Sequence, residues 1–239
     1  MLAAAGVLLF CQQALAERAD NFRQAKRQAI KLYASLATNN TTFYCGCAID
    51  SSHKKWQPDW HACGFKPRKQ PARASRIEWE HIVPAWEFGH QLQCWQQGGR
   101  KQCQQSSRQF NLMASDLHNL VPAIGEVNGD RSNYRFSQWN APSGQYGACD
   151  MVVDFKARKV QPPERARGAI ARAYLYMHDT YHLQLAPAQQ RLFAAWNRQY
   201  PVDEKECRRD NAIAGVQGNH NIYVQSVCLR QDISGKIAQ

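Results

Sequence analysis

Eight of the nine cysteines lie after residue 16 of this 239-residue chain, and they constrain its fold more than any other feature. An even number of cysteines in an exported protein is typical of disulfide bonds. Eight cysteines allow about 105 pairings, so the connectivity does not follow from the sequence. The short separations favour Cys94 with Cys103 and Cys207 with Cys228.

A zinc site is the alternative to disulfides for part of this set. Its candidate ligands are Cys45, Cys47 and Cys63 with a nearby histidine, His53 or His61. Zinc fingers usually place about two to four residues between paired cysteine ligands, and only one residue separates the first two here. We therefore expect disulfides.

Residues 1–16 have the features of a signal peptide. They carry no charged side chain, most are apolar, and Ala14-Leu15-Ala16 is a small-x-small cleavage site. The bulky Phe10 before Cys11 argues against lipoprotein processing. We expect cleavage after Ala16, a periplasmic or secreted protein, and one mixed domain of α+β class over residues 17–239.

The charge of the chain favours an anionic partner. Its net charge is +11 and its pI is about 9.4. A positive excess of this size suits nucleic acid or a membrane surface, and simple solubility is the alternative explanation. Because no second long apolar run follows the signal-like segment, we expect no membrane-spanning segment. We also expect a monomer in solution.

Hydrophobic spacing predicts both helices and strands. The expected helices cover residues 21–36, 128–139, 164–181 and 187–200, and the expected strands cover 43–47, 77–83 and 117–124. Pro122 places the last strand at a sheet edge or a bulge. Residues 53–75 are expected to form a long loop, and residues 98–101 a turn.

The segment Ile-Glu-Trp-Glu-His-Ile-Val-Pro-Ala-Trp at 77–86 sets two carboxylates and a histidine in an apolar, strand-like run. Charged groups are costly to bury unless they are paired or bind a metal. Glu80 and His81 therefore suggest a metal ligand beside a general base, and a half-exposed strand is the alternative. Strand alternation would send these two side chains to opposite faces, so we expect the strand to end or distort near His81.

A second segment, residues 116–133, has a strand, a glycine turn and a polar helix start. The Asn128 amide oxygen suits a divalent cation, and Mg²⁺ binds one or two protein oxygens together with water and phosphate. From spacing alone, Asn128 is equally explained as a helix N-cap, and Asn128-Gly129 as a hairpin turn.

Together the segments 77–91, 98–101 and 116–133 resemble the bacterial endonuclease I family, exported nucleases with a ββα-metal (His-Me finger) active site. The resemblance implies a sequence-non-specific endonuclease that leaves 5′-phosphate and 3′-hydroxyl ends on DNA, with RNA left open as a substrate. It implies one Mg²⁺, with Mn²⁺ or Ca²⁺ as substitutes. The alternatives are a non-catalytic nucleic-acid-binding protein and a small-molecule phosphoesterase.

The resemblance also assigns roles by position. His81 would be the general base, Glu80 and Asn128 the metal ligands, Glu78 the holder of a water molecule beside the ion, and Arg100 the residue that stabilises charge on the phosphate. Among the surrounding basic residues, Arg76, Lys101 and Arg131 are expected to contact the nucleic-acid backbone, and a solvated basic face is the alternative.

Overall fold

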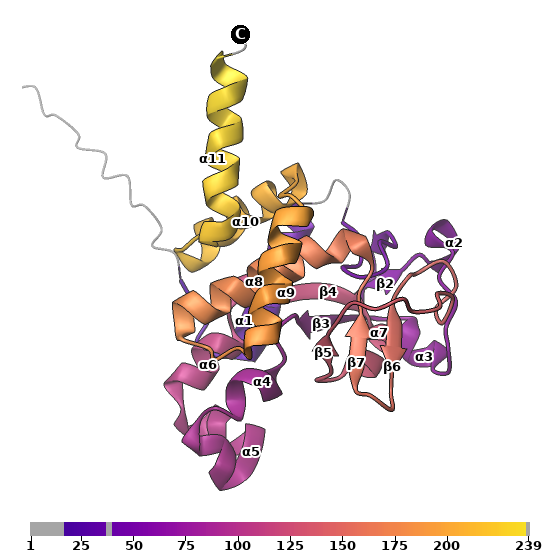
Figure 1. Ribbon diagram of the computed structural model, residues 1–239, viewed down its shortest axis with the longest axis horizontal. Helices are drawn as coiled ribbons and strands as arrows, with labels where there is room; N and C mark the ends of the chain where they lie inside the picture. Colours follow the sequence, from indigo (N-terminus) through magenta and orange to yellow (C-terminus); the bar gives the residue numbers. More distant parts are fainter. Residues whose placement is uncertain (1–16, 37–39, 238–239) are drawn as a thin grey trace, which may run out of the picture.

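Small sheets and a larger number of helices make up the fold in the computed structural model, which describes residues 17–36 and 40–237 (Figure 1). The helices are α1 (Phe22–Ser35), α2 (Trp60–Cys63), α3 (Pro71–Ala74), α4 (Ala85–Gly89), α5 (Gln93–Ser106), α6 (Arg108–Ala114), α7 (Gly125–Arg131), α8 (Glu164–Tyr181), α9 (Pro187–Gln199), α10 (Glu204–Gln217) and α11 (Ile222–Ile237). The predicted signal peptide lies outside the described residues.

The strands form short sheets scattered along the chain. They are β1 (Ile49–Asp50) with β2 (Gln57–Pro58), β3 (Ile77–His81) with β4 (Leu120–Ile124), and the three-stranded set β5 (Arg135–Phe136), β7 (Lys159–Gln161) and β6 (Val152–Asp154). Interspersed helices and mostly antiparallel strands confirm the predicted single α+β domain.

The antiparallel pair β3–β4 runs directly into α7, and this ββα unit organises the centre of the molecule (Figure 1). All five residues of β4 are buried, which explains its continuous apolar sequence. Pro122 pairs opposite Trp79, and its carbonyl accepts a hydrogen bond from the Phe43 amide at 2.8 Å. A two-stranded sheet has only edges, so the edge position predicted for Pro122 is confirmed.

The long helices of the C-terminal third cover this unit. The bounds of α8 match the predicted helix, and α9 ends one residue before the predicted end. The rings of Tyr174 and Phe193 stack at 4.2 Å between the two helices, and Trp196 is buried beside them. These aromatic side chains therefore belong to the core, as their helical spacing predicts.

Several local predictions were wrong. The segment 53–75, expected to be a long loop, contains β2, α2 and α3. Residues 117–119, expected in a strand, form a 3-10 turn before β4. Residues 43–47 form a turn, because Thr42 and Cys47 exchange hydrogen bonds across it and leave no strand pairing for the residues between them. The helix expected over 128–139 begins at Gly125 and ends at Arg131. Ser132 has a φ of 53°, outside the helical region, and the chain then enters β5.

Four disulfides join all eight cysteines that follow residue 16. Cys94–Cys103 and Cys207–Cys228 confirm the two local predictions, and the other bonds are Cys45–Cys149 and Cys47–Cys63. The last two consume the cysteines of the alternative zinc site. That alternative is therefore wrong, because a disulfide sulfur has no thiolate to offer a metal.

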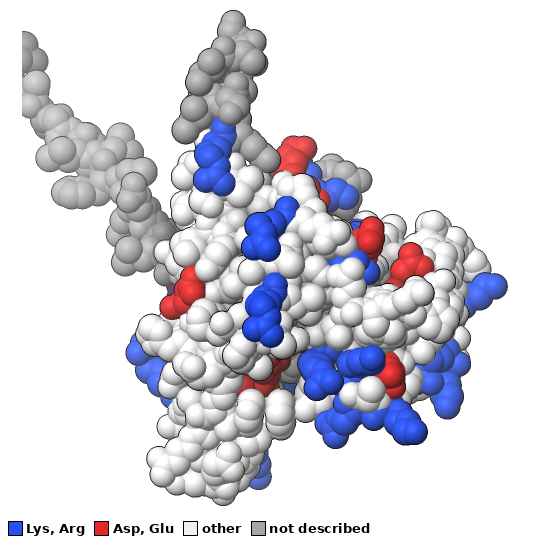
Figure 2. Space-filling model, viewed as in Figure 1, with Lys and Arg blue, Asp and Glu red and all other residues white. Residues whose placement is uncertain are grey.

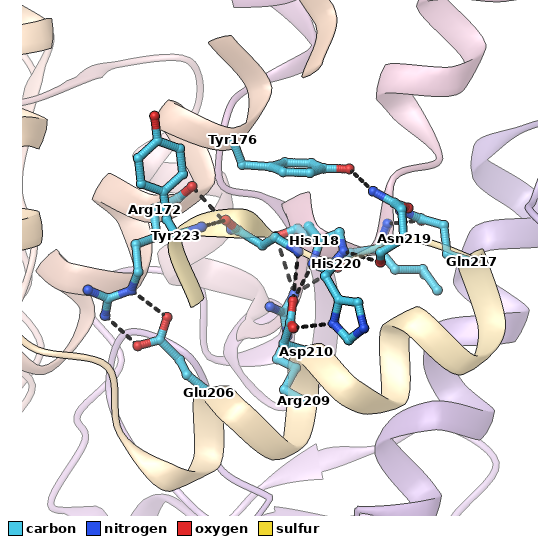
Figure 3. Close-up of polar contacts among 12 residues, drawn as sticks. His118, Arg172, Tyr176, Glu206, Arg209, Asp210, Gln217, Asn219, His220 and Tyr223 are labelled. Atoms are coloured by element: carbon cyan, nitrogen blue, oxygen red, sulfur yellow. Dashed lines mark hydrogen bonds and ion pairs between the residues drawn. The ribbon is translucent and has the colours of Figure 1, made fainter. Parts of the chain in front are cut away.

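A buried polar network fixes the C-terminal helices behind β4 (Figure 3). Asp210 of α10 accepts hydrogen bonds from the Asn221 amide and lies 2.6 Å from His220 Nδ1 and 3.6 Å from His118 Nδ1. His118 donates from Nε2 to the Asn219 carbonyl at 3.0 Å. The network ties the turn between α10 and α11 to the segment that leads into β4.

Candidate active site

A cleft of about 660 Å³ opens beside the ββα unit. Residues from the hairpin, from α7 and from distant elements line it: Phe22, Lys26, Arg73, Glu78, Trp79, Glu80, His81, Trp86, Trp95, Arg100, Asn128, Gly129 and Arg131 are among them. The cleft therefore brings together Glu78, Glu80, His81, Arg100 and Asn128, which the sequence assigned to one site.

Glu80 is a buried carboxylate with two partners at the same oxygen. Its Oε1 accepts a hydrogen bond from the Tyr44 hydroxyl at 2.9 Å and lies 3.2 Å from the Arg131 guanidinium. Burial raises the pKa of Glu80 to about 7, against the opposing effect of Arg131. A carboxylate in this setting gains stability from a further positive charge in the cleft.

His81 is held in one tautomer by a hydrogen bond from Nε2 to the Ala114 carbonyl, 2.8 Å away. A carbonyl oxygen only accepts, so Nε2 carries the proton of the neutral ring and Nδ1 is left to receive one. Burial lowers the pKa of His81 to about 4, and the charges of Arg100 and Arg131 act in the same direction. The ring is therefore neutral near pH 7.

The end of β3 explains how Glu80 and His81 share one cleft. The strand stops at His81, as predicted, and the next residues are held by other contacts. Arg131 donates to the carbonyls of His81 and Ile82, and the Asn119 side chain accepts from the Val83 amide and donates to its carbonyl. Beyond the end of the strand, these side chains therefore supply hydrogen bonds to backbone groups that a neighbouring strand would otherwise bind.

Asn128 is oriented by Glu78. Its Nδ2 donates to Glu78 Oε2 at 2.9 Å, which leaves the amide oxygen, the possible ligand atom, outside this hydrogen bond. Arg73 and Arg76 also donate to the Glu78 carboxylate. Burial acts to raise the pKa of Glu78, and the hydrogen bonds from these arginines outweigh it and lower the pKa. These contacts make Glu78 a positioning residue for Asn128.

Gly129 leaves room for this arrangement. A Cβ at Gly129 would lie 2.0 Å from Nη1 of Arg73, the arginine that binds Glu78. A glycine at this position therefore leaves room for the Arg73 side chain. Because both residues lie inside α7, the N-cap and the hairpin-turn explanations of Asn128-Gly129 are wrong. Helix α7 thus places the Asn128 side chain at the cleft, and Gly129 of the same helix allows Arg73 to pack closely against the backbone.

Arg100 reaches the cleft from a break in α5. Gly98 and Gly99 leave helical geometry, and the φ of 64° at Gly99 is one that glycine adopts without strain. The predicted turn at 98–101 is thus a kink inside a helical segment, closed by the Cys94–Cys103 bond. The Arg100 guanidinium lies 5.7 Å from the centre of the Phe22 ring.

The three residues expected to contact nucleic acid occupy different environments. Arg76 is half exposed and binds Glu78 at the cleft, and Lys101 is exposed beside Arg100 but does not line the cleft. Arg131 is completely buried, and its guanidinium binds Glu80 and three backbone carbonyls. Its burial does not agree with the expected phosphate contact, because the side chain borders the cleft without being exposed to solvent and its guanidinium is engaged by Glu80 and the backbone.

Sequence reasoning missed several residues in the cleft or in contact with its side chains. Phe22 of α1 places its ring 4.6 Å from the His81 ring, Tyr44 binds Glu80, and Trp86 is exposed at the cleft wall. Phe22 follows the apolar periodicity of its helix, and Tyr44 was assigned to a strand. No local signal distinguished them from core residues.

The donor set of the cleft fits Mg²⁺. In the part of the chain that the structure describes, no three His, Cys, Asp or Glu side chains gather into a site of the kind that holds zinc. The cleft offers the Glu80 carboxylate and the Asn128 amide oxygen, whereas the Glu78 carboxylate that also lines it accepts hydrogen bonds from two arginines and from Asn128. Mg²⁺ suits such a sparse set of oxygens because it keeps several waters and binds substrate phosphate.

Comparison with known proteins identifies the family of this chain. The family model described as Endonuclease I matches residues 21–228. The chain is 56% identical over 214 residues to a periplasmic deoxyribonuclease of Aeromonas hydrophila, covering 89% of each chain. It is 49% identical to Endonuclease-1 of Buchnera aphidicola subsp. Acyrthosiphon pisum, covering 89% of this chain and 83% of the relative.

A more distant relative is an extracellular ribonuclease of Bacillus amyloliquefaciens, 30% identical over 132 residues and covering 46% of this chain and 43% of the relative. The family model spans most of the chain, including the ββα unit, α5 and every disulfide. This chain belongs to the Endonuclease I family.

Proposed function

We propose that this protein is an exported, sequence-non-specific endonuclease that hydrolyses phosphodiester bonds of DNA to 5′-phosphate and 3′-hydroxyl ends. His81 is the general base, and Glu80 and Asn128 hold one Mg²⁺. The observation that carries the proposal is the shared cleft, where a neutral histidine with a free Nδ1 lies among a buried carboxylate, an amide oxygen and Arg100.

Each residue has a defined part in the reaction. Mg²⁺, when bound, supplies positive charge that neutralises the phosphate and the leaving oxygen. His81 Nδ1 accepts the proton of the attacking water while the Ala114 carbonyl keeps the ring oriented. Arg100 stabilises the charge that grows on the phosphate oxygens. Glu78 orients Asn128, and Arg131 keeps the end of β3 and the Glu80 carboxylate in place.

Affinity for the substrate comes from charge. Lys and Arg side chains gather over the β6–β7 hairpin and α3 on the face shown in Figure 2, where acidic side chains are sparse. Contacts to phosphate bind the backbone without reading sequence. Relatives named periplasmic and extracellular deoxyribonucleases, together with four disulfides, support an oxidising compartment outside the cytoplasm. No described helix combines the length and apolarity needed to span a membrane.

Cleavage of plasmid DNA and of RNA, with and without chelator, tests the activity. We expect the chelator to stop cleavage and His81→Ala to lower the rate roughly 10²–10⁴-fold while binding persists. His61→Ala, at an exposed position outside the cleft, is the matched control. A His81→Ala variant that keeps more than about a tenth of the rate would remove His81 as the base. Binding without any cleavage by the wild type would support a non-catalytic binding protein.

Metal titration tests the proposed ligands separately. Glu80→Ala and Asn128→Ala each remove one oxygen from the set, so both variants should need more Mg²⁺ for any remaining activity. Metal affinity that is unchanged in both variants would contradict the assignment.

A further inference from the structure

We propose that the Trp86 indole is a stacking platform for a nucleobase next to the phosphate that is cleaved. This inference rests on the proposed nuclease function and adds a binding subsite to it. Trp86 is 45% exposed, and it is the most exposed tryptophan among the residues that the structure describes. A single exposed apolar residue is ordinary, so the evidence for a binding role is the position of Trp86 and not its exposure alone.

Trp86 lies in the wall of the catalytic cleft. The same cleft is lined by His81, which stands five positions earlier in the chain, and by Arg100. Helix α4 begins at Ala85, directly after Pro84. The short segment from His81 to Trp86 therefore leaves these two side chains little freedom to move apart. A base bound on this indole would therefore belong to a nucleotide adjoining the reacting phosphate.

The indole is held by a second ring. His90 stacks on Trp86 with ring centroids 4.1 Å apart and an interplanar angle of 10°. His90 Nδ1 also lies 2.8 Å from the Trp86 carbonyl, to which it donates, so the imidazole is fixed by a hydrogen bond as well as by the stack. An oriented, flat aromatic surface loses little conformational entropy when a base packs on it.

The surrounding charges complete a nucleotide-binding arrangement. Lys26 and Arg100 line the same cleft as the indole, so cations for phosphate lie beside a surface for a nucleobase. Proteins that bind single strands without sequence preference combine these two elements, since every base has a π-face. The platform thus explains how a base can be held in a site that does not read its identity. It accepts a base only after that base leaves its stack, which favours single-stranded or locally opened DNA.

Binding in the presence of chelator tests the platform without cleavage. Fluorescence anisotropy would compare a thymidine oligonucleotide of about 12 residues with an abasic tetrahydrofuran oligomer of equal length and charge. We expect Trp86→Ala to weaken binding of the base-bearing strand roughly tenfold and to leave binding of the abasic strand unchanged. Trp86→Phe should keep most of the affinity. Ile222→Ala, at an exposed apolar position of α11 outside the cleft, should bind both strands like the wild type.

Equal loss on both strands would show a structural role for Trp86, and equal affinity of Trp86→Ala and wild type for the base-bearing strand would show no role; either result overturns the platform. The Trp86→Phe variant keeps the test valid if Trp86→Ala folds poorly, because its discrimination between the two strands must persist. Wild-type cleavage of plasmid DNA with Mg²⁺ is measured in parallel. Absence of that cleavage would contradict the nuclease function, whereas failure of the strand comparison alone would contradict only the platform.

Discussion

The guanidinium of Arg131 lies 3.2 Å from Oε1 of Glu80, and both side chains are buried. Burial by itself lowers the pKa of Arg131, and the Glu80 carboxylate together with Tyr44, Tyr174 and Glu87 outweighs that effect and raises the pKa. The same arginine donates to the carbonyls of His81 and Ile82. One side chain therefore connects the proposed metal ligand with the backbone that carries the proposed base.

Replacing Arg131 with alanine should lower stability sharply. The change leaves the Glu80 carboxylate buried without its charge partner, and losing one partner of a buried pair typically costs about 3–5 kcal/mol. Urea unfolding measures this loss. Lys101→Ala, at an exposed position, should leave stability unchanged and reduce the salt dependence of DNA binding by about one unit of slope. If Arg131→Ala instead kept full stability and lowered the salt dependence of DNA binding, Arg131 would be a direct phosphate contact after all.

Gly129→Ala should reduce activity without unfolding α7. Alanine favours a helix by about 1 kcal/mol over glycine, but its Cβ would lie 2.0 Å from Arg73 Nη1 and displace the arginine that binds Glu78. We expect a loss of roughly tenfold or more in kcat/KM, since misplacing a positioned group by about 1 Å can cost 10²-fold. Gly215→Ala in α10 is the matched control, because nothing lies within 4 Å of its Cβ. Its activity should be unchanged and its stability slightly higher; full activity of Gly129→Ala would contradict the role given to Arg73.

Removing either of two disulfides should lower stability, but only one of the two removals should also lower catalytic activity. Replacing both Cys94 and Cys103 with serine removes a bond with a sequence separation of 9 that closes the kink carrying Arg100. The kcat/KM of the folded double variant should therefore fall. The short loop predicts a stability loss of about 3 kcal/mol. The corresponding Cys207 and Cys228 double variant, with a sequence separation of 21, should stay active once folded. Steady-state kinetics with thermal unfolding checks both, and equal kinetics in the two variants would argue against positioning of Arg100 by the disulfide.

His118 should make stability depend on pH. Burial lowers the pKa of His118, although the carboxylates of Asp116 and Asp210 oppose this effect. An unfolded histidine takes up a proton near pH 6.5, whereas the folded one stays neutral, so the unfolded state binds more protons as the pH falls. The stability present above about pH 6.5 is therefore lost progressively below it. His118→Gln should show a smaller loss between pH 7.5 and pH 5.5 in urea unfolding, and exposed His61→Gln should behave like the wild type. Identical pH profiles in all three proteins would contradict the prediction.

The sequence by itself determined the parts of the protein that follow local periodicity or local spacing. The bounds of α8 come from the pattern of apolar residues. The end of the strand near His81 was expected because regular alternation would send Glu80 and His81 to opposite faces. Two disulfides come from cysteines close in the chain. The two motifs that carry Glu80 and Asn128 are also local, and their likeness to a nuclease family is sufficient to recognise the family to which the chain belongs.

Only the tertiary structure decided which charged residues are buried in the fold and which are exposed to solvent. Arg131 looks like Arg76 in sequence, yet one is wholly buried and the other is half exposed. Gly129 follows Asn128 as it would in a turn, but the approach of Arg73 explains its place in a helix. Phe22 reaches His81 from 59 positions away, and Cys45 pairs with Cys149 across a separation of 104. Burial and contacts between distant segments arise from packing of the whole chain, and no local pattern records them.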